Sequence, residues 1–201
     1  MSTKNNSRPN LLIGSSLAGE VNNVTQTQKV CNHFFHYTGK LNSAVIIRLS
    51  NWLKNQRVKF QKVIIIDEKT LFSSRTIIEQ RKVTELYQSL INQVAPYCKR
   101  ILMIEAPHKC TSKNELNSAC FVYNNECDAK FSRMQGQLLA PETTPHLRVQ
   151  LLTKETLAHE CEYFDHTIDW SEVDIRKLTN QDGRRFTDHT KRTLIRYIIE
   201  N

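Results

Sequence analysis

Short unbroken runs of apolar residues predict the buried strands of this chain. They stand at residues 11–13, 63–66 and 101–104. Unbroken runs of this length are typical of parallel strands that are covered on both faces. The first run stops at Gly14-Ser15-Ser16, where small residues of this kind indicate a turn.

Two further strands are predicted from weaker patterns. Apolar residues alternate with polar ones over residues 147–151, which is typical of a half-buried strand. Residues 28–31 are a second, less regular strand candidate. Residues 33–42, which include Gly39, are interpreted as a loop.

Apolar residues at helical spacing predict helices between these strands. The predicted helices cover residues 17–23, 43–54, 77–94, 121–139 and 188–200. This alternation predicts an α/β fold with three α/β/α layers, in which a doubly wound, mainly parallel five-stranded sheet is covered on both faces. The polar residues 1–10 are predicted to form a disordered arm, and residues 11–201 a single domain.

Small and polar residues follow the predicted strands, where ligands bind in sheets of this type. The segments 14–17, 67–72 and 105–110 should therefore share one edge of the sheet. Ser16 opens the predicted helix after the first strand. Either Ser15 or Ser16 caps this helix, or Ser16 acts as a nucleophile beside backbone amides that stabilise an oxyanion.

The net charge of +8 favours an acidic partner such as nucleic acid, although a basic, well-solvated surface explains it equally well. One basic cluster contains Lys54, Arg57, Lys59 and Lys62, and another surrounds Arg184 and Arg185. No zinc-finger spacing or aromatic-rich motif for binding single strands accompanies this charge. The charge therefore indicates a class of partner without identifying it.

The six cysteines include no Cys-x-x-Cys pair. Two His-x-Cys pairs, at 108–110 and 159–161, suggest zinc as an alternative, but we expect reduced thiols and no metal. No Gly-rich nucleotide-binding motif is present, so no cofactor is expected. Without a run of roughly 18 apolar residues or a secretory signal, no membrane span is expected and the predicted location is cytoplasmic, with the nucleus as the alternative.

The order of these features over residues 10–199 resembles the SGNH, or GDSL, hydrolase family. Gly14-Ser15-Ser16-Leu17 is similar to its first block, Gly-Asp-Ser-Leu, so the resemblance implies Ser16 as nucleophile. It also implies Gly39 as an oxyanion-hole amide and Asp182 as the acid of the final Asp-x-x-His block. A similar domain occurs in the esterase-like open reading frames of some retroelements, where a basic charge would be in keeping.

Several departures from the family pattern suggest a degenerate member. Ser15 stands where the family has Asp, the Gly-x-Asn-Asp block is absent, and Arg185 occupies the position of the catalytic His. Arginine stays protonated and cannot accept a proton from serine. The first hypothesis is therefore a domain with weak or no esterase activity that binds a nucleic acid or protein partner, with Arg184 and Arg185 as an anion-binding pair.

Two other hypotheses remain open at this point. His189 lies four residues after Arg185, so an active serine esterase would use it as a displaced base for Ser16, with Asp182 or Asp188 orienting it. A flavodoxin-like or Rossmann-like ligand-binding domain would keep the fold without the hydrolase relationship. Neither the substrate nor the oligomeric state follows from the sequence.

Overall fold

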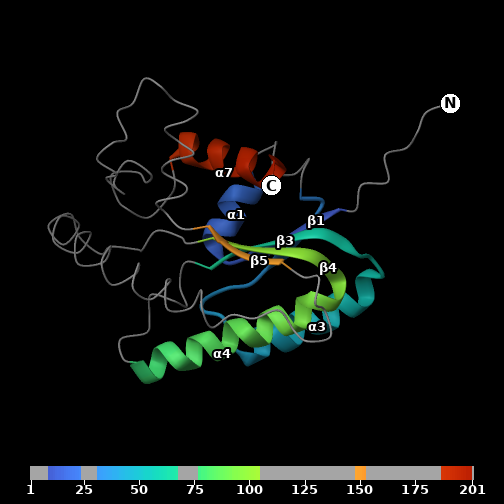
Figure 1. Ribbon diagram of the computed structural model, residues 1–201, viewed down its shortest axis with the longest axis vertical. Coiled ribbons are helices and arrows are strands. Elements are labelled where there is room, and N and C mark those ends of the chain that lie inside the picture. Colours follow the sequence, from blue (N-terminus) through green and yellow to red (C-terminus); the bar gives the residue numbers. More distant parts are fainter. Residues whose placement is uncertain (1–8, 24–30, 68–76, 105–147, 153–186, 201) are drawn as a thin grey trace, which may run out of the picture.

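The computed structural model describes residues 9–23, 31–67, 77–104, 148–152 and 187–200. These residues form helices and strands that alternate for most of their length (Figure 1). Their bounds are β1 (Asn10–Gly14), α1 (Ser16–Asn22), β2 (His33–His36), α3 (Ser43–Gln56), β3 (Phe60–Ile66), α4 (Ile77–Val94), the short 3₁₀ helix η2 (Ala95–Tyr97), β4 (Cys98–Ile104), β5 (Arg148–Leu152) and α7 (Asp188–Glu200).

The strands form a sheet in the order β2-β1-β3-β4-β5, and every neighbouring pair is parallel. The prediction of an α/β fold with a parallel sheet is therefore confirmed. The chain passes from β1 to β2 on one side and then to β3 on the other, so the order of strands reverses at β1. Ligands of open α/β sheets bind at such a reversal, beyond the carboxyl ends of the strands.

The apolar run of β3 is divided between the two faces of the sheet. Val63 and Ile65 belong to a buried cluster with the apolar side chains of α3 and α4. Ile64 and Ile66 belong to a second cluster, which includes residues of α1 and α7. In Figure 1, α3 and α4 lie below the sheet, and α1 and α7 lie above it. Burial on both faces explains why the run contains no polar residue.

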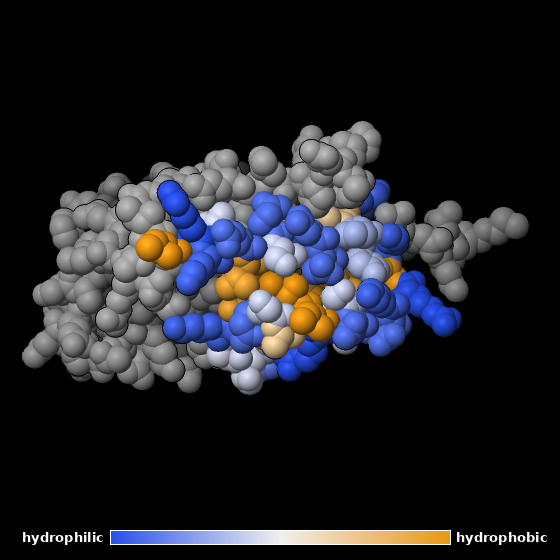
Figure 2. All heavy atoms as spheres, turned by 90° about the horizontal axis from the view of Figure 1, so that it is seen from below, coloured by the Kyte–Doolittle hydropathy of each residue, from blue (hydrophilic) through white to orange (hydrophobic). Residues whose placement is uncertain are grey.

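Helices α3 and α4 cover one face with an apolar stripe and expose the opposite side. The Asn42 side chain accepts a hydrogen bond of 3.0 Å from the Val45 amide and so caps α3, which ends at Arg57 in the left-handed region. Figure 2 shows that the outward surface of these helices is largely hydrophilic, with a few apolar spots. The predictions of helices over 43–54 and 77–94 are confirmed.

The interpretation of residues 33–42 as a loop is wrong for His33–His36, which form β2. This strand pairs with β1 and lies at the edge of the sheet, so only Phe35 is buried and the pattern of a covered strand is missing. The prediction of a strand over 28–31 is wrong for Cys31, which belongs to no strand. The predicted arm over 1–10 is wrong at its end, because Asn10 is the first residue of β1. Residues 1–8 of that arm, residues 28–30 and the predicted helix over 121–139 lie outside the described residues.

Candidate active site at the carboxyl edge of the sheet

All strands end on the same rung of the sheet, which we call the carboxyl edge. The rung consists of His36, Gly14, Ile66, Ile104 and Leu152. Directly after Gly14, the buried Ser15 leads into the exposed Ser16, the first residue of α1. The fold thus places the exposed Ser16 at the reversal of strand order, where open α/β sheets bind ligands.

The sequence predicted that the side chain of Ser15 or Ser16 could cap α1. Ser15 takes the N-cap position, but its hydroxyl makes no capping hydrogen bond to the helix, so the capping prediction is wrong for this side chain. The tight turn instead depends on Gly14. A Cβ atom there would lie 2.2 Å from the Ile66 carbonyl oxygen and 2.4 Å from the Ala18 Cβ, so only glycine fits between β3 and α1.

The loop that carries Gly39 is attached to the same edge. The Tyr37 amide donates a 3.1 Å hydrogen bond to the Gly14 carbonyl, which ties the residues after β2 to the turn before Ser16. Arg48 donates to the His36 carbonyl at 3.3 Å, which fixes the loop to α3. Gly39 itself is exposed and has φ of 78°, a conformation that favours glycine. The structure therefore brings the loops of Ser16 and Gly39 to one edge.

Asp67, in a segment that was predicted to lie at this edge, is hydrogen-bonded to a neighbouring helix. Asp67 follows β3, is only 6% exposed, and accepts a 3.1 Å hydrogen bond from the Tyr87 hydroxyl of α4. The sequence analysis did not predict this contact with Tyr87. The signal was a single hydroxyl-bearing residue on the otherwise apolar stripe of α4.

The first turn of α7 packs beside α1, on the same face of the sheet. The Lys191 ammonium lies 3.6 Å from the Glu20 carboxylate, one helical turn beyond Ser16. Thr187 caps α7 by accepting a hydrogen bond of 3.2 Å from the Thr190 amide. His189 belongs to this turn, is half-buried, and has its Nε2 atom shielded from solvent. Asp182, Arg184 and Arg185 lie outside the described residues.

The described cysteines offer no alternative nucleophile at neutral pH. Cys31 and Cys98 are free thiols, and burial raises the pKa of each to about 12, so both stay protonated. Over the described ranges, no group of three or more His, Cys, Asp and Glu side chains is arranged to hold a metal ion. Among the helices in those ranges, none is both long and apolar enough to cross a bilayer.

Comparison with known proteins gives a structural relationship and no sequence relationship. No protein-family model matches the chain, and no curated protein matches its sequence. A crystal structure at 2.00 Å of a "putative acylhydrolase" from Bacteroides fragilis NCTC 9343 superposes with a TM-score of 0.61. The match covers 100% of this chain and 88% of that protein, at 10% sequence identity. The chain has an acylhydrolase-like α/β fold.

Proposed function

We propose that this chain is an SGNH-hydrolase-like domain that acts by binding and has weak or no esterase activity. In this proposal the sheet is the centre of a doubly wound, three-layer domain, and Ser16 occupies the position of the nucleophile. The observation that carries the proposal is the exposed Ser16 on the turn after β1, at the strand reversal of an acylhydrolase-like fold.

In this proposal, backbone amides at the carboxyl edge would hold an acyl group. The Gly39 amide lies in a loop that is hydrogen-bonded to the turn before Ser16. Backbone amides of this kind stabilise an oxyanion when they point at the reacting carbonyl. The same amides, with Arg184 and Arg185, would hold a carboxylate or phosphate if no reaction followed.

In this proposal the serine lacks an effective base. The family resemblance places Arg185 where a histidine is needed, and an arginine side chain cannot take the serine proton. The family position of Asp before the nucleophile is taken by Ser15, which is fully buried. Loss of a triad member lowers the rate by several powers of ten, so we propose binding as the main role.

The alternative is an active serine esterase in which His189 is the base and Asp182 orients it. The observation in favour of this function is the ion pair between Lys191 and Glu20, which holds the first turn of α7 against α1 close to Ser16. The shielded Nε2 atom of His189 counts against it, because that nitrogen would have to approach an exposed hydroxyl.

Hydrolysis of a short-chain p-nitrophenyl ester tests the proposal. We expect the native chain and Ser16→Ala to hydrolyse the ester at rates within about twofold of each other, because a serine without a base contributes little. A loss of about 10³-fold or more in Ser16→Ala would overturn the proposal and support the esterase. His189→Gln would then have to lose activity as well, with an unchanged circular dichroism spectrum as the control for folding.

A further inference from the structure

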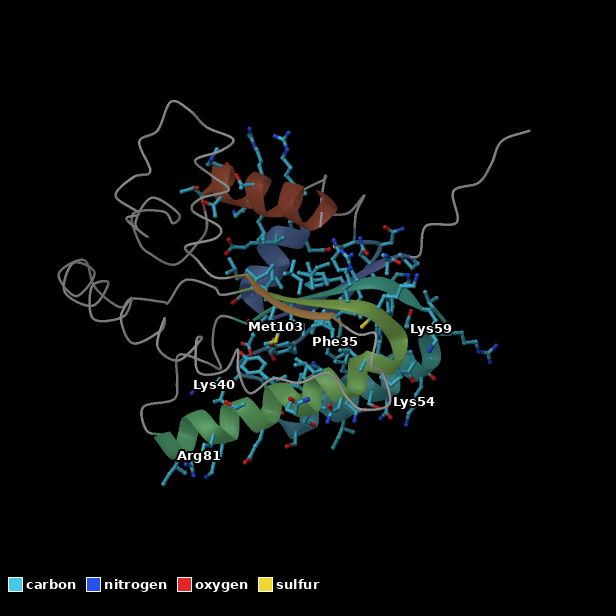
Figure 3. All side chains as sticks on the ribbon, viewed as in Figure 1. Phe35, Lys40, Lys54, Lys59, Arg81 and Met103 are labelled. Carbon is cyan, nitrogen blue, oxygen red and sulfur yellow. The ribbon has the colours of Figure 1, made fainter. Side chains whose placement is uncertain are left out.

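Basic residues gather at the opposite edge of the sheet, where the strands begin. This amino edge, as we define it, consists of residues 54–62, 95–100 and 148. Every charged residue in these segments is basic: Lys54, Arg57, Lys59, Lys62, Lys99, Arg100 and Arg148. Figure 3 shows Lys54 and Lys59 at one end of the molecule and Lys40, in the Gly39 loop, at the other. The basic edge is therefore separate from the candidate active site.

Three of these residues form a row across neighbouring strands. Lys62 on β3 pairs in register with Arg100 on β4, and Arg100 pairs with Arg148 on β5. Neighbouring strands lie about 4.8 Å apart, so Lys62 and Arg100 bring two positive charges close together. Like charges at directly opposite positions repel each other, and burial together with Arg100 lowers the pKa of Lys62. The strand register therefore aligns basic residues along this edge.

Partly exposed rings stand among these cations. The Lys59 ammonium donates a hydrogen bond to the Pro96 carbonyl and lies 5.3 Å from the centre of the half-buried Tyr97 ring. The half-buried Trp52 lies two residues before Lys54 and meets the His33 ring edge-on, at 6.4 Å between centres. Both rings pack against the core with part of their surface exposed. Cations beside partly exposed rings are a combination that binds single-stranded nucleic acid, because phosphates contact the cations and bases stack on the rings.

We propose that the amino edge binds the sugar–phosphate backbone of single-stranded nucleic acid. An anionic membrane would favour exposed apolar side chains beside the cations. The large apolar side chains that are exposed in the described part of the chain, Ile47 and Ile78, belong to the middle of α3 and the start of α4 instead. The proposal gives a location and a partner to the binding role proposed above, and it requires no reaction at Ser16.

Fluorescence anisotropy with a labelled single strand of roughly 20 nucleotides tests this surface. The test variant is Lys54→Glu/Lys99→Glu, which reverses two exposed charges of the amino edge. The matched control is Arg81→Glu/Lys82→Glu, which changes the net charge equally at an exposed site on α4, far from that edge (Figure 3). Both variants are compared with the native chain over a range of salt concentrations.

We expect the native chain to bind the strand with an affinity that falls as salt rises. The amino-edge variant should bind about tenfold more weakly, with a salt slope less steep by about 1.4, because each lost phosphate contact contributes about 0.7. The α4 control should stay within about twofold of the native affinity. Equal weakening by both variants, or absence of binding in the native chain, would overturn the proposal. Ester hydrolysis, measured separately, should be the same in all three proteins, so failure of the binding test is distinguishable from failure at Ser16.

A duplex of the same sequence and vesicles that contain phosphatidylserine complete the test. The single strand should bind more tightly than the duplex at equal salt, because only unpaired bases can stack on the rings. Equal or tighter binding of the duplex would overturn the single-strand assignment. Charge-dependent binding to the vesicles without binding to the oligonucleotide would overturn the choice of nucleic acid.

Discussion

Gly14 and Ile66 approach so closely that a Cβ atom on Gly14 would lie 2.2 Å from the Ile66 carbonyl oxygen. The two residues are register partners at the ends of β1 and β3, on the rung that carries the candidate active site. On the other side of Gly14, the Ala18 Cβ leaves no more room. The exposed position of Ser16 thus depends on a glycine two residues earlier.

Gly14→Ala should therefore destabilise the protein. Both neighbours belong to regular elements, and a backbone carbonyl cannot move aside as a flexible side chain can. We expect the free energy of unfolding to fall by about 2–4 kcal/mol in a urea titration. Gly19→Ala is the matched control, since a Cβ atom there meets nothing within 4 Å and alanine favours the helix by about 0.5–1 kcal/mol. Equal stability of the two variants would show that the close approach is unimportant.

The hydrogen bond from Tyr87 to the buried Asp67 should stabilise the carboxyl edge. Tyr87→Phe removes the hydroxyl, keeps the ring, and takes one donor from a carboxylate that is 6% exposed. We expect a loss of about 1–3 kcal/mol in the free energy of unfolding, as is usual when a buried polar group loses a hydrogen-bond partner. Tyr97→Phe serves as the control, with an expected change within about 0.5 kcal/mol, because its described contact is made by the ring. An unchanged stability of Tyr87→Phe would contradict the role of this bond.

Lys62→Met should raise stability at neutral pH. Burial and the neighbouring Arg100 lower the pKa of Lys62 from its ordinary value of 10.5, so its protonated form is less stable in the folded chain than in the unfolded chain. Methionine removes this cost, with an expected gain of about 1 kcal/mol at pH 7. The gain should shrink as the pH rises from the lowered pKa of Lys62 towards 10.5, and it should be lost above 10.5, where both states of the native chain have lost the proton.

Unfolding titrations at pH 7 and at pH values towards 11 would measure this dependence. Lys99→Met, at an exposed position of the same edge, is the control and should show little change at either pH. A gain for Lys62→Met that stays constant with pH would mean that its charge is not the source of the effect.

Arg57→Gly separates stability from binding at the amino edge. Arg57 has φ of 50°, a left-handed conformation in which a Cβ atom is unfavourable. Glycine at this helix end should raise the free energy of unfolding by about 0.5–1 kcal/mol. The same variant should bind a single-stranded oligonucleotide more weakly, with a salt slope less steep by about 0.7. Binding by Arg57→Gly that is as tight as that of the native chain, or tighter, would contradict a direct role for the Arg57 charge.

The sequence was sufficient to predict the elements with strong periodicity. Residues 63–66 and 101–104 were predicted as strands from their unbroken apolar runs, which reflect burial of both faces. The helices α3 and α7 were predicted because their apolar residues recur at helical spacing. The edge strand β2 was missed, since two phenylalanines between two histidines form neither a long apolar run nor an alternating pattern. Burial by neighbours, which is a tertiary property, decides whether such a segment is a strand.

The candidate site was predictable only as far as topology determines it. Ser16 could be placed at the end of the first strand from its position in the sequence, and the structure places it there. The contact of Asp67 with Tyr87 and the assembly of Lys62 beside Arg100 join residues that are distant in sequence. These relationships follow from strand register and helix packing, which the apolar pattern alone does not specify.

The central claim is that Ser16 retains the place of a nucleophile without an effective base. Reaction with a fluorophosphonate, followed by mass spectrometry of the peptide that contains Ser16, tests this most directly, because the reagent reports nucleophilicity without a choice of substrate. An active serine esterase in the same reaction mixture shows that the reagent is competent. The account predicts no adduct on Ser16 while that esterase is labelled. An adduct on Ser16 that is absent from Ser16→Ala would contradict the account and identify the chain as a working serine hydrolase.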